Sequence, residues 1–353
     1  MTASQAVPRF CEIDFSPLPE DGPCGRSLLV AGAVVAGLAL TACGSAAENA
    51  GSGSTPAAQS GGKKSIGLIT FSGTDPSANI VVASAKEKAA ALGYDVTVID
   101  AQGQVDQANT AMQNLVQRKV SGIAVTVFPT SSLAAGLAAT GPANVPVVSS
   151  GGGTAPGIAV NVDDSQGEKV TQQAIDDSKG AGDVLTLTYL GGRPCRLRLA
   201  SFNETVAAKA PGLKVSRQAV TVPGQVESAT NATLAWLAAH PKGSAPSFSI
   251  YACFDDPALG AVAALKQTKR DDVKVYSFNG VPPALAAVQD GTMTATLWFD
   301  QSAVGGTLVD VLDKSIKNGA SGDSQQVPAP SVLVTKANYD AFATEHPDAV
   351  KAG

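Results

Sequence analysis

The sequence is poor in aromatic residues and has no concentrated positive charge. Only 5% of its 353 residues are Phe, Trp or Tyr, and the formal net charge is −5. Because Lys and Arg form no basic block, nucleic acid and anionic membrane surfaces are poor partners. No apolar run approaches the roughly 20 residues that a membrane-spanning helix needs.

Several catalytic and cofactor motifs are also missing. There is no Cys-x-x-Cys, and the two histidines, His240 and His346, lie near predicted helix ends rather than strand ends. This argues against a metal site and against Ser-His-Asp catalysis. No glycine-rich nucleotide motif follows a predicted strand. We therefore expect a protein without cofactor or metal that is not an enzyme.

The stretch 65–100 predicts one β-α-β unit. Ile66 to Phe71 is an apolar run typical of a strand buried on both faces. Asp75 and Pro76 then predict a helix start, with the carboxylate as cap and proline at the first position. Ligands of open parallel sheets lie beyond the carboxyl ends of the strands, so the residues after Phe71 are expected at a binding cleft.

The same alternation continues to the end of the chain. Helices are predicted at 105–118, 131–139, 166–179, 202–210, 228–239, 256–268, 282–290, 303–318 and from 337, and strands at 122–128, 145–150, 157–162, 183–190, 213–222, 248–254, 273–278, 292–299 and 332–334. A single sheet of this size would be unusually wide. The pattern therefore predicts an α/β fold of two doubly wound parallel-sheet lobes.

The N-terminal region resembles an export signal. Residues 1–25 are either disordered or the product of an upstream start site, and an uncharged run follows from Ser27 to Leu40. The sequence Leu40-Thr41-Ala42-Cys43 resembles a bacterial lipobox, which implies cleavage before Cys43 and a diacylglycerol on its sulfur; the alternative is an ordinary buried cysteine. Residues 44–64 are small and polar and are expected to form a flexible tether. We expect an extracytoplasmic protein held on the cell membrane by this lipid.

From Lys64 to about Asn338 the chain resembles the periplasmic sugar-binding proteins of the ribose-binding (type I) class, the substrate receptors of ABC importers. The phrases that carry the resemblance, in the family's order, include LITFSGTDP, NVPVVSS, NVDDSQG, DDPALGAVAALKQT, VKVYSFNG and AVQDGTMTATLWFDQSAVG. The resemblance implies three crossovers between the lobes, which we place near Asp163-Asp164, Phe299-Asp300 and 328–331. The expected lobes are 65–163 with 300–328, and 164–299 with 329–353.

The resemblance also implies a function, which is the reversible capture of a small molecule between the lobes. The expected partners are a sugar, polyol or related ring compound and a membrane ABC permease, and we expect a monomer. A membrane-anchored sensory receptor for a similar ligand is the alternative. A transcription factor of the related repressor class would need an N-terminal DNA-binding helix pair, which the signal segment replaces.

Candidate ligand residues follow from family positions at the strand ends. In the first lobe they are Thr74, Asp75, Phe128 and Ser150, and in the second lobe Arg196, Phe254, Asp255, Asn279, Trp298 and Phe299. Asp75 is either a ligand contact or only a helix cap. Asp255 is either a contact or a structural residue at a helix N-terminus. The Trp298-Phe299 pair either stacks on a ring or packs at the hinge.

Two departures from the family pattern bear on the ligand. The usual aromatic pair after Asp75 is missing. The usual Asp-Arg pair is replaced by 149–153, Ser-Ser-Gly-Gly-Gly, which forms a flexible loop or a phosphate nest. Phe128 and Phe254 replace polar family residues, which suggests a less polar or cyclic ligand than a simple pentose. Cys195 and Cys253 either pair in an oxidising compartment or remain two free thiols.

Overall fold

The computed structural model describes residues 64–319 and 324–351. The described residues belong to one compact unit. The predictions for residues 1–63, including the signal run, the lipidation of Cys43 and nearly all of the tether, lie outside the described residues.

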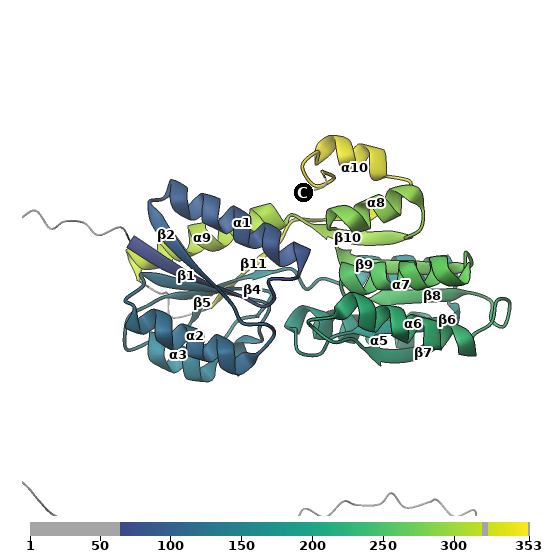
Figure 1. Ribbon diagram of the computed structural model, residues 1–353, viewed down its shortest axis with the longest axis horizontal. Coiled ribbons are helices and arrows are strands. Elements are labelled where there is room, and N and C mark those ends of the chain that lie inside the picture. Colours follow the sequence, from purple (N-terminus) through teal and green to yellow (C-terminus); the bar gives the residue numbers. More distant parts are fainter. Residues whose placement is uncertain (1–63, 320–323, 352–353) are drawn as a thin grey trace, which may run out of the picture. The chain divides into compact units, whose positions relative to one another are not determined.

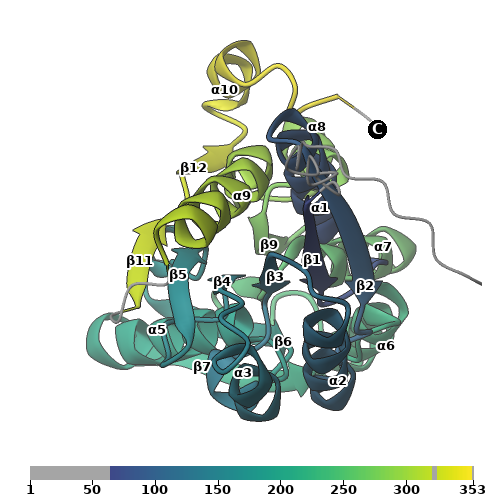
Figure 2. The same ribbon diagram turned by 90° about the vertical axis from the view of Figure 1, so that its left-hand side faces the viewer.

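The first of two sheets is entirely parallel. Its strands are β1 (Lys64–Thr70), β2 (Tyr94–Asp100), β3 (Gly122–Thr126), β4 (Val147–Ser150), β5 (Ile158–Asp163) and β11 (Gln325–Pro328). They are hydrogen-bonded in the order β11-β5-β4-β3-β1-β2, as Figure 2 shows from one end. Helices cover both faces, so the central strands are buried on both sides and read as apolar runs.

The second sheet is parallel except at one edge. Its strands are β6 (Ala181–Thr188), β7 (Gly212–Ala219), β8 (Phe248–Ala252), β9 (Val273–Asn279), β10 (Ala295–Phe299) and β12 (Ser331–Thr335). The order is β12-β10-β9-β8-β6-β7, with β12 antiparallel to β10. The predicted class of two doubly wound α/β sheets is confirmed.

Four α-helices flank the first sheet. They are α1 (Pro76–Ala91), α2 (Val105–Gln117), α3 (Ala134–Thr140) and α9 (Gln301–Asn318), with a short 3-10 turn at Thr130–Ser132. The helices α1 and α9 pack together over one face, and α2 and α3 lie over the other (Figure 1). The N-terminal ends of α1 and α9 follow directly on a strand end or a crossover, which places both at the ligand edge.

The remaining helices accompany the second sheet. They are α4 (Glu168–Ser178), α5 (Arg193–Lys209), α6 (Gln225–Ala239), α7 (Asp255–Thr268), α8 (Pro282–Asp290) and α10 (Tyr339–Glu345). The helix α6 packs against α7, and α4 packs against α5. The chain passes between the sheets after β5, after β10 and between β11 and β12, which gives the three crossovers. The exact lobe boundaries remain a prediction.

One predicted boundary is wrong in a way that matters for the site. The helix α5 begins at Arg193, whereas the sequence pattern placed its start at Phe202 and left the arginines in a loop. Proline stands at its second position, where a missing N–H costs nothing, and the Arg and Leu residues that follow are good helix formers. The arginines are therefore distributed around a helix rather than along a loop.

Candidate functional site

The carboxyl ends of strands from both sheets surround a cavity of about 720 Å³, part of it open to solvent. Its polar lining comes from Ser72, Asp75, Ser77, Thr126, Ser150, Asp164, Tyr189, Arg198, Gln225, Asn279 and Gln301. Its apolar lining comes from Phe71, Ala78, Val81, Val127, Gly192, Pro194, Cys195, Val222 and Phe254. Ser150 ends β4 and Asn279 ends β9, so the cavity lies at the edge where open parallel sheets bind ligands.

Four of the predicted ligand residues line this cavity. They are Asp75, Ser150, Phe254 and Asn279. Asn279 adopts a φ of 100°, in the left-handed region that side chains other than glycine rarely occupy. A strained conformation at a strand end is typical of a residue held for a purpose. Contact of these four residues with a ligand remains a prediction.

Thr74 and Phe128 lie elsewhere. Thr74 is exposed, and its hydroxyl oxygen lies 2.9 Å from the hydroxyl oxygen of Ser72. Phe128 is fully buried and packs on Phe71, with 4.6 Å between ring centroids. Phe128 therefore supports Phe71, which lines the cavity, and does not face the cavity itself.

The carboxylate of Asp255 is hydrogen-bonded by other residues of the protein. Its carboxylate accepts hydrogen bonds from the Ser277 hydroxyl, from the Thr296 hydroxyl at 2.9 Å and from the Val281 amide at 2.8 Å. The side chain is buried and lies outside the cavity lining. These contacts support the structural alternative, in which Asp255 joins the start of α7 to β9, β10 and the start of α8.

Trp298 and Phe299 also lie outside the main cavity. Trp298 packs against Phe342 and His346 of the C-terminal segment, with ring centroids 5.2 Å and 4.5 Å away. Phe299 lies beneath the Arg198 guanidinium, whose central carbon is 5.3 Å from the ring centroid. Both aromatic residues line a second cavity on the side of α10. Their contacts support hinge packing, the second of the two alternatives.

The cavity contains Arg198 in place of the predicted Arg196. Residues two apart on a helix point in nearly opposite directions, so only one of the two can face the cavity. Arg196 is exposed, whereas Arg198 is 1% exposed and lines the cavity. The prediction of Arg196 rested on the family position of a ligand-binding arginine within an expected loop, and this segment is a helix in the structure.

Arg198 organises its surroundings through three acceptors. Its terminal nitrogens donate to the carbonyl oxygens of Cys253, at 2.7 Å, and Asp164, at 2.5 Å, and to the side-chain oxygen of Asn279, at 3.3 Å. The guanidinium also lies 4.5 Å from the Phe278 ring centroid. Burial lowers the pKa of Arg198, and the nearby charge of Asp164 opposes that effect. Arg198 thus joins elements of the first and second sheets at the cavity floor.

A disulfide between Cys195 and Cys253 decides between the two alternatives left open by the sequence. The Cα atoms are 5.1 Å apart, and the bond connects the first turn of α5 to the end of β8. Arg198 lies one turn along the same helix and donates to the Cys253 carbonyl. The disulfide therefore holds both ends of that hydrogen bond in place.

Replacing Cys253 with alanine is expected to lower the free energy of unfolding by about 2–5 kcal/mol, since the bond closes a loop with a sequence separation of 58. Urea denaturation with and without a thiol reductant measures the effect. The denaturation midpoint of a double variant with alanine at both Cys195 and Cys253 should be the same with and without the reductant. An unchanged midpoint for the reduced wild-type protein would contradict the expectation.

Asp75 caps α1 as predicted and also lines the cavity. Its Oδ1 accepts the Ser77 amide at 2.9 Å. Burial raises the pKa of this carboxyl to about 7, and the charges of Asp256 and Asp164 add to the rise. The carboxyl therefore binds a proton in the folded state at a pH where the unfolded chain has released it.

This difference predicts that the Asp75 contribution to stability is fully present below about pH 4 and is lost as the pH rises toward 7. Asp75→Asn keeps the helix cap but removes the titrating group. Between pH 5 and pH 7, we expect the free energy of unfolding to fall by about 1–2 kcal/mol less in the variant than in the wild-type protein. Urea denaturation at both pH values measures these free energies. An equal change between pH 5 and pH 7 in the variant and the wild-type protein would contradict the prediction.

In the segment Gly151-Gly152-Gly153, two backbone amides are hydrogen-bonded within the protein. The Gly151 amide donates to the Val162 carbonyl, and the Gly153 amide donates to the side-chain oxygen of Asn161 at 2.9 Å. Amides committed in this way are not free for an anion, so the phosphate-nest alternative finds no support here.

Several polar residues of the cavity were not predicted from the sequence, among them Asp164, Gln225 and Gln301. Asp164 follows β5, and Gln225 and Gln301 are the first residues of α6 and α9. The sequence pattern predicts that these helices begin at 228 and 303, so neither glutamine was recognised as a first helical residue.

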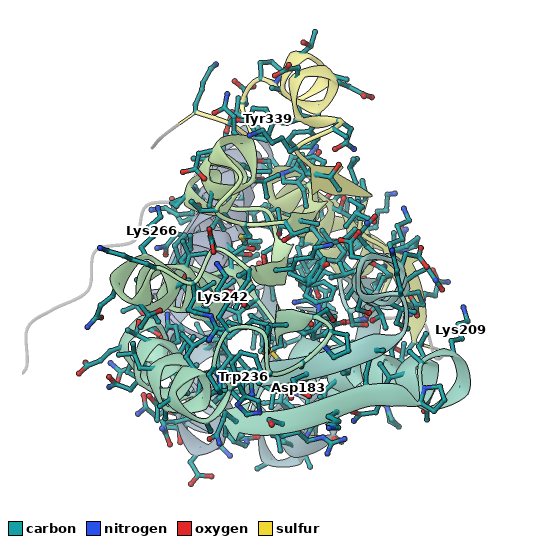
Figure 3. The ribbon with its side chains drawn as sticks, turned by 90° about the vertical axis from the view of Figure 1, so that its right-hand side faces the viewer. Asp183, Lys209, Trp236, Lys242, Lys266 and Tyr339 are labelled. Atoms are coloured by element: carbon teal, nitrogen blue, oxygen red, sulfur yellow. A yellow bond between two sulfur atoms is a disulfide. The ribbon has the colours of Figure 1, made fainter. Side chains whose placement is uncertain are left out.

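The histidines lie away from the cavity, as expected. His240 stacks on Trp236 with ring centroids 4.5 Å apart, and its Nε2 is 3.9 Å from Asp183. Figure 3 shows Trp236 beside Asp183 in the second sheet and its helices. Across residues 64–319 and 324–351, no group of His, Cys, Asp or Glu side chains could hold a metal ion. No helix in these ranges has the length and apolar character for crossing a membrane.

Comparisons with known proteins agree with this geometry. Residues 66–320 match the model of the periplasmic binding protein domain. The ribose import binding protein RbsB of Escherichia coli (strain K12) is 28% identical over 272 residues, covering 74% of this chain and 88% of the relative.

Two solved structures extend the comparison. An ABC transporter solute-binding protein from Agrobacterium vitis with bound allitol has a TM-score of 0.73 at 20% identity, covering 80% of this chain and 98% of its own, which shows the shared fold. One from Mycobacterium smegmatis with bound glycerol has a TM-score of 0.70 at 27% identity, covering 79% and 96%. These relatives are binding proteins for transport rather than enzymes, and the chain belongs to the periplasmic binding protein domain family.

Proposed function

We propose that this protein is the substrate-binding lipoprotein of an ABC importer and captures a sugar or polyol between its two lobes. The observation that carries the proposal is the cavity at the strand ends, where Arg198, Asp75, Asp164 and Asn279 converge from both sheets. Groups that both donate and accept hydrogen bonds suit the hydroxyls of such a ligand. Ribose, allitol and glycerol, the ligands of the relatives described above, belong to this class.

Contacts between elements of the two sheets offer a means of holding the ligand. Arg193 at the start of α5 forms an ion pair with Asp163 at the end of β5, at 3.2 Å, and its amide donates to the Val127 carbonyl. The rings of Phe71 and Tyr189 meet edge to face, with centroids 5.8 Å apart. Domain closure around a ligand would form such contacts and release would break them.

The lipid anchor and the permease complete the proposal. Cleavage before Cys43 and acylation of its sulfur would place the binding unit outside the cell on a tether of about 20 residues, within reach of a membrane permease. Mass spectrometry of the membrane-extracted protein tests the anchor. An N-terminus at Cys43 carrying diacylglycerol is the expected result.

A thermal-shift screen against sugars, alditols, cyclitols and nucleosides tests the capture function. A bound ligand at a hundred times its dissociation constant should stabilise the protein by about 2.7 kcal/mol. Deleting the gene should then abolish uptake of the ligand found in the screen. Normal uptake with loss of a ligand-induced transcriptional response would favour the sensory alternative.

A further inference from the structure

Four buried polar atoms around the cavity have no hydrogen-bond partner among the described residues. They are Asp164 Oδ1, Arg198 Nε, Gln225 Oε1 and Gln301 Nε2. Each side chain is less than a tenth exposed, at 8%, 1%, 5% and 4% respectively. A buried polar atom without a partner is costly, so four around one cavity indicate that a ligand supplies the partners. Two of them accept hydrogen bonds and two donate.

The orientation of Gln225 is fixed by a neighbour. Its Nε2 donates to Asp256 Oδ2 at 2.7 Å, which leaves Oε1 as the atom without a partner. A carboxylate accepts hydrogen bonds and cannot donate them, so the amide cannot reverse without losing this bond. Gln225 therefore presents an acceptor.

The Asp164 carboxylate occupies space left by a glycine. A Cβ atom on Gly151 would lie 2.7 Å from Asp164 Oδ1 and 2.9 Å from Pro194. Gly151 also has a φ of +67°, which other residues rarely adopt. The absence of a side chain at the end of β4 thus lets a carboxylate that follows β5 reach the cavity.

We propose that Asp164, Gln225 and Gln301 are specificity-determining residues that select a neutral, polyhydroxylated ligand and reject its carboxylate counterpart. The inference rests on the proposed capture function and names the ligand class of that same cavity. A hydroxyl group donates to Asp164 or Gln225 and accepts from Gln301, so one kind of group satisfies all three.

The charges of the cavity explain the rejection of acids. Asp75 and Asp164 both line it, and burial already raises the pKa of each carboxyl, so an anionic ligand beside them could bind only if protons neutralised these groups. The lining contains one positively charged side chain, Arg198, whose two terminal nitrogens already donate to protein oxygens. Three of the five guanidinium N–H groups therefore already bind protein oxygens, and this single cation lies among two carboxyl groups in the lining.

Calorimetric titration of the purified protein tests the ligand class. The probes are xylitol, ribitol, ribose and myo-inositol, together with xylonate and ribonate as carboxylate counterparts. We expect at least one neutral compound to bind, and its carboxylate counterpart to bind at least about 100-fold more weakly. Equal or tighter binding of an acid would overturn this inference while leaving capture intact. Binding of none of the probes would count against the proposed function itself.

Variants of the two glutamines test the residues. Gln301→Met and Gln225→Met should each weaken binding of the best neutral probe by about 10-fold to 100-fold. Because Gln301 Nε2 has no partner without ligand, Gln301→Met should not lower the melting temperature of the ligand-free protein. A purely structural role predicts the opposite, which is lower stability with unchanged affinity.

Thr233 provides a matched control on the same helix as Gln225. Its hydroxyl oxygen is also buried without a partner in the described structure, but it does not line the cavity. Thr233→Val should leave the affinity unchanged. If both glutamine variants bind the probe as tightly as Thr233→Val does, the assignment is wrong.

Discussion

Replacing Arg198 with methionine is expected to lower the free energy of unfolding by about 3–5 kcal/mol and to weaken ligand binding at least about 100-fold. Methionine fills much of the volume but donates no hydrogen bond to the carbonyls of Asp164 and Cys253. The Asp164 carboxylate also loses the charge that opposes the rise of its pKa. Urea denaturation and calorimetric titration measure the two effects.

Arg196→Met is the control for this variant. It makes the same chemical change two residues away on the same helix, at an exposed position outside the cavity. We expect its stability to stay within about 0.5 kcal/mol of the wild-type value and its affinity to be unchanged. If Arg196→Met weakened binding as much as Arg198→Met, the original placement of the ligand arginine at Arg196 would be restored.

Much of the fold was predictable because its strands are buried on both faces. A strand such as β3, with all five residues buried, is mainly apolar, and the sequence between such runs had the length of a crossover helix. The strand β11 was missed because Gln325–Pro328 is a mostly exposed edge strand. Its assignment depends on pairing with β5, which local sequence does not reveal.

The site was predictable only where strand ends define it. Asp75, Ser150 and Asn279 follow or end recognisable strands, and all three line the cavity. The choice between Arg196 and Arg198 required the exact start of α5, because an error of two residues changes the helix face by about half a turn. Gln225 and Gln301 resemble ordinary first-turn residues, and only the tertiary structure shows that their amides face the cavity.

Replacing Gly305 with valine is expected to destabilise the protein by about 3 kcal/mol or more and to weaken ligand binding. A Cβ atom at this position in α9 would collide with the Val81 carbonyl of α1 and lie 3.0 Å from the Ala85 amide. The colliding atoms belong to helix backbone, so the two helices would have to separate. Val81 and Gln301, one on each helix, line the cavity and would move apart.

The neighbouring Gly306 separates this effect from the general cost of a helix glycine. A Cβ atom there meets nothing within 4 Å, so Gly306→Ala should stabilise α9 by about 0.5–1 kcal/mol and leave binding unchanged. Thermal denaturation and titration of both variants make the comparison. A loss of stability in Gly305→Val together with a gain in Gly306→Ala would show that close approach of α1 and α9, rather than helix propensity, holds the first-sheet side of the cavity in place. Equal effects would mean that the α1–α9 spacing does not control the site.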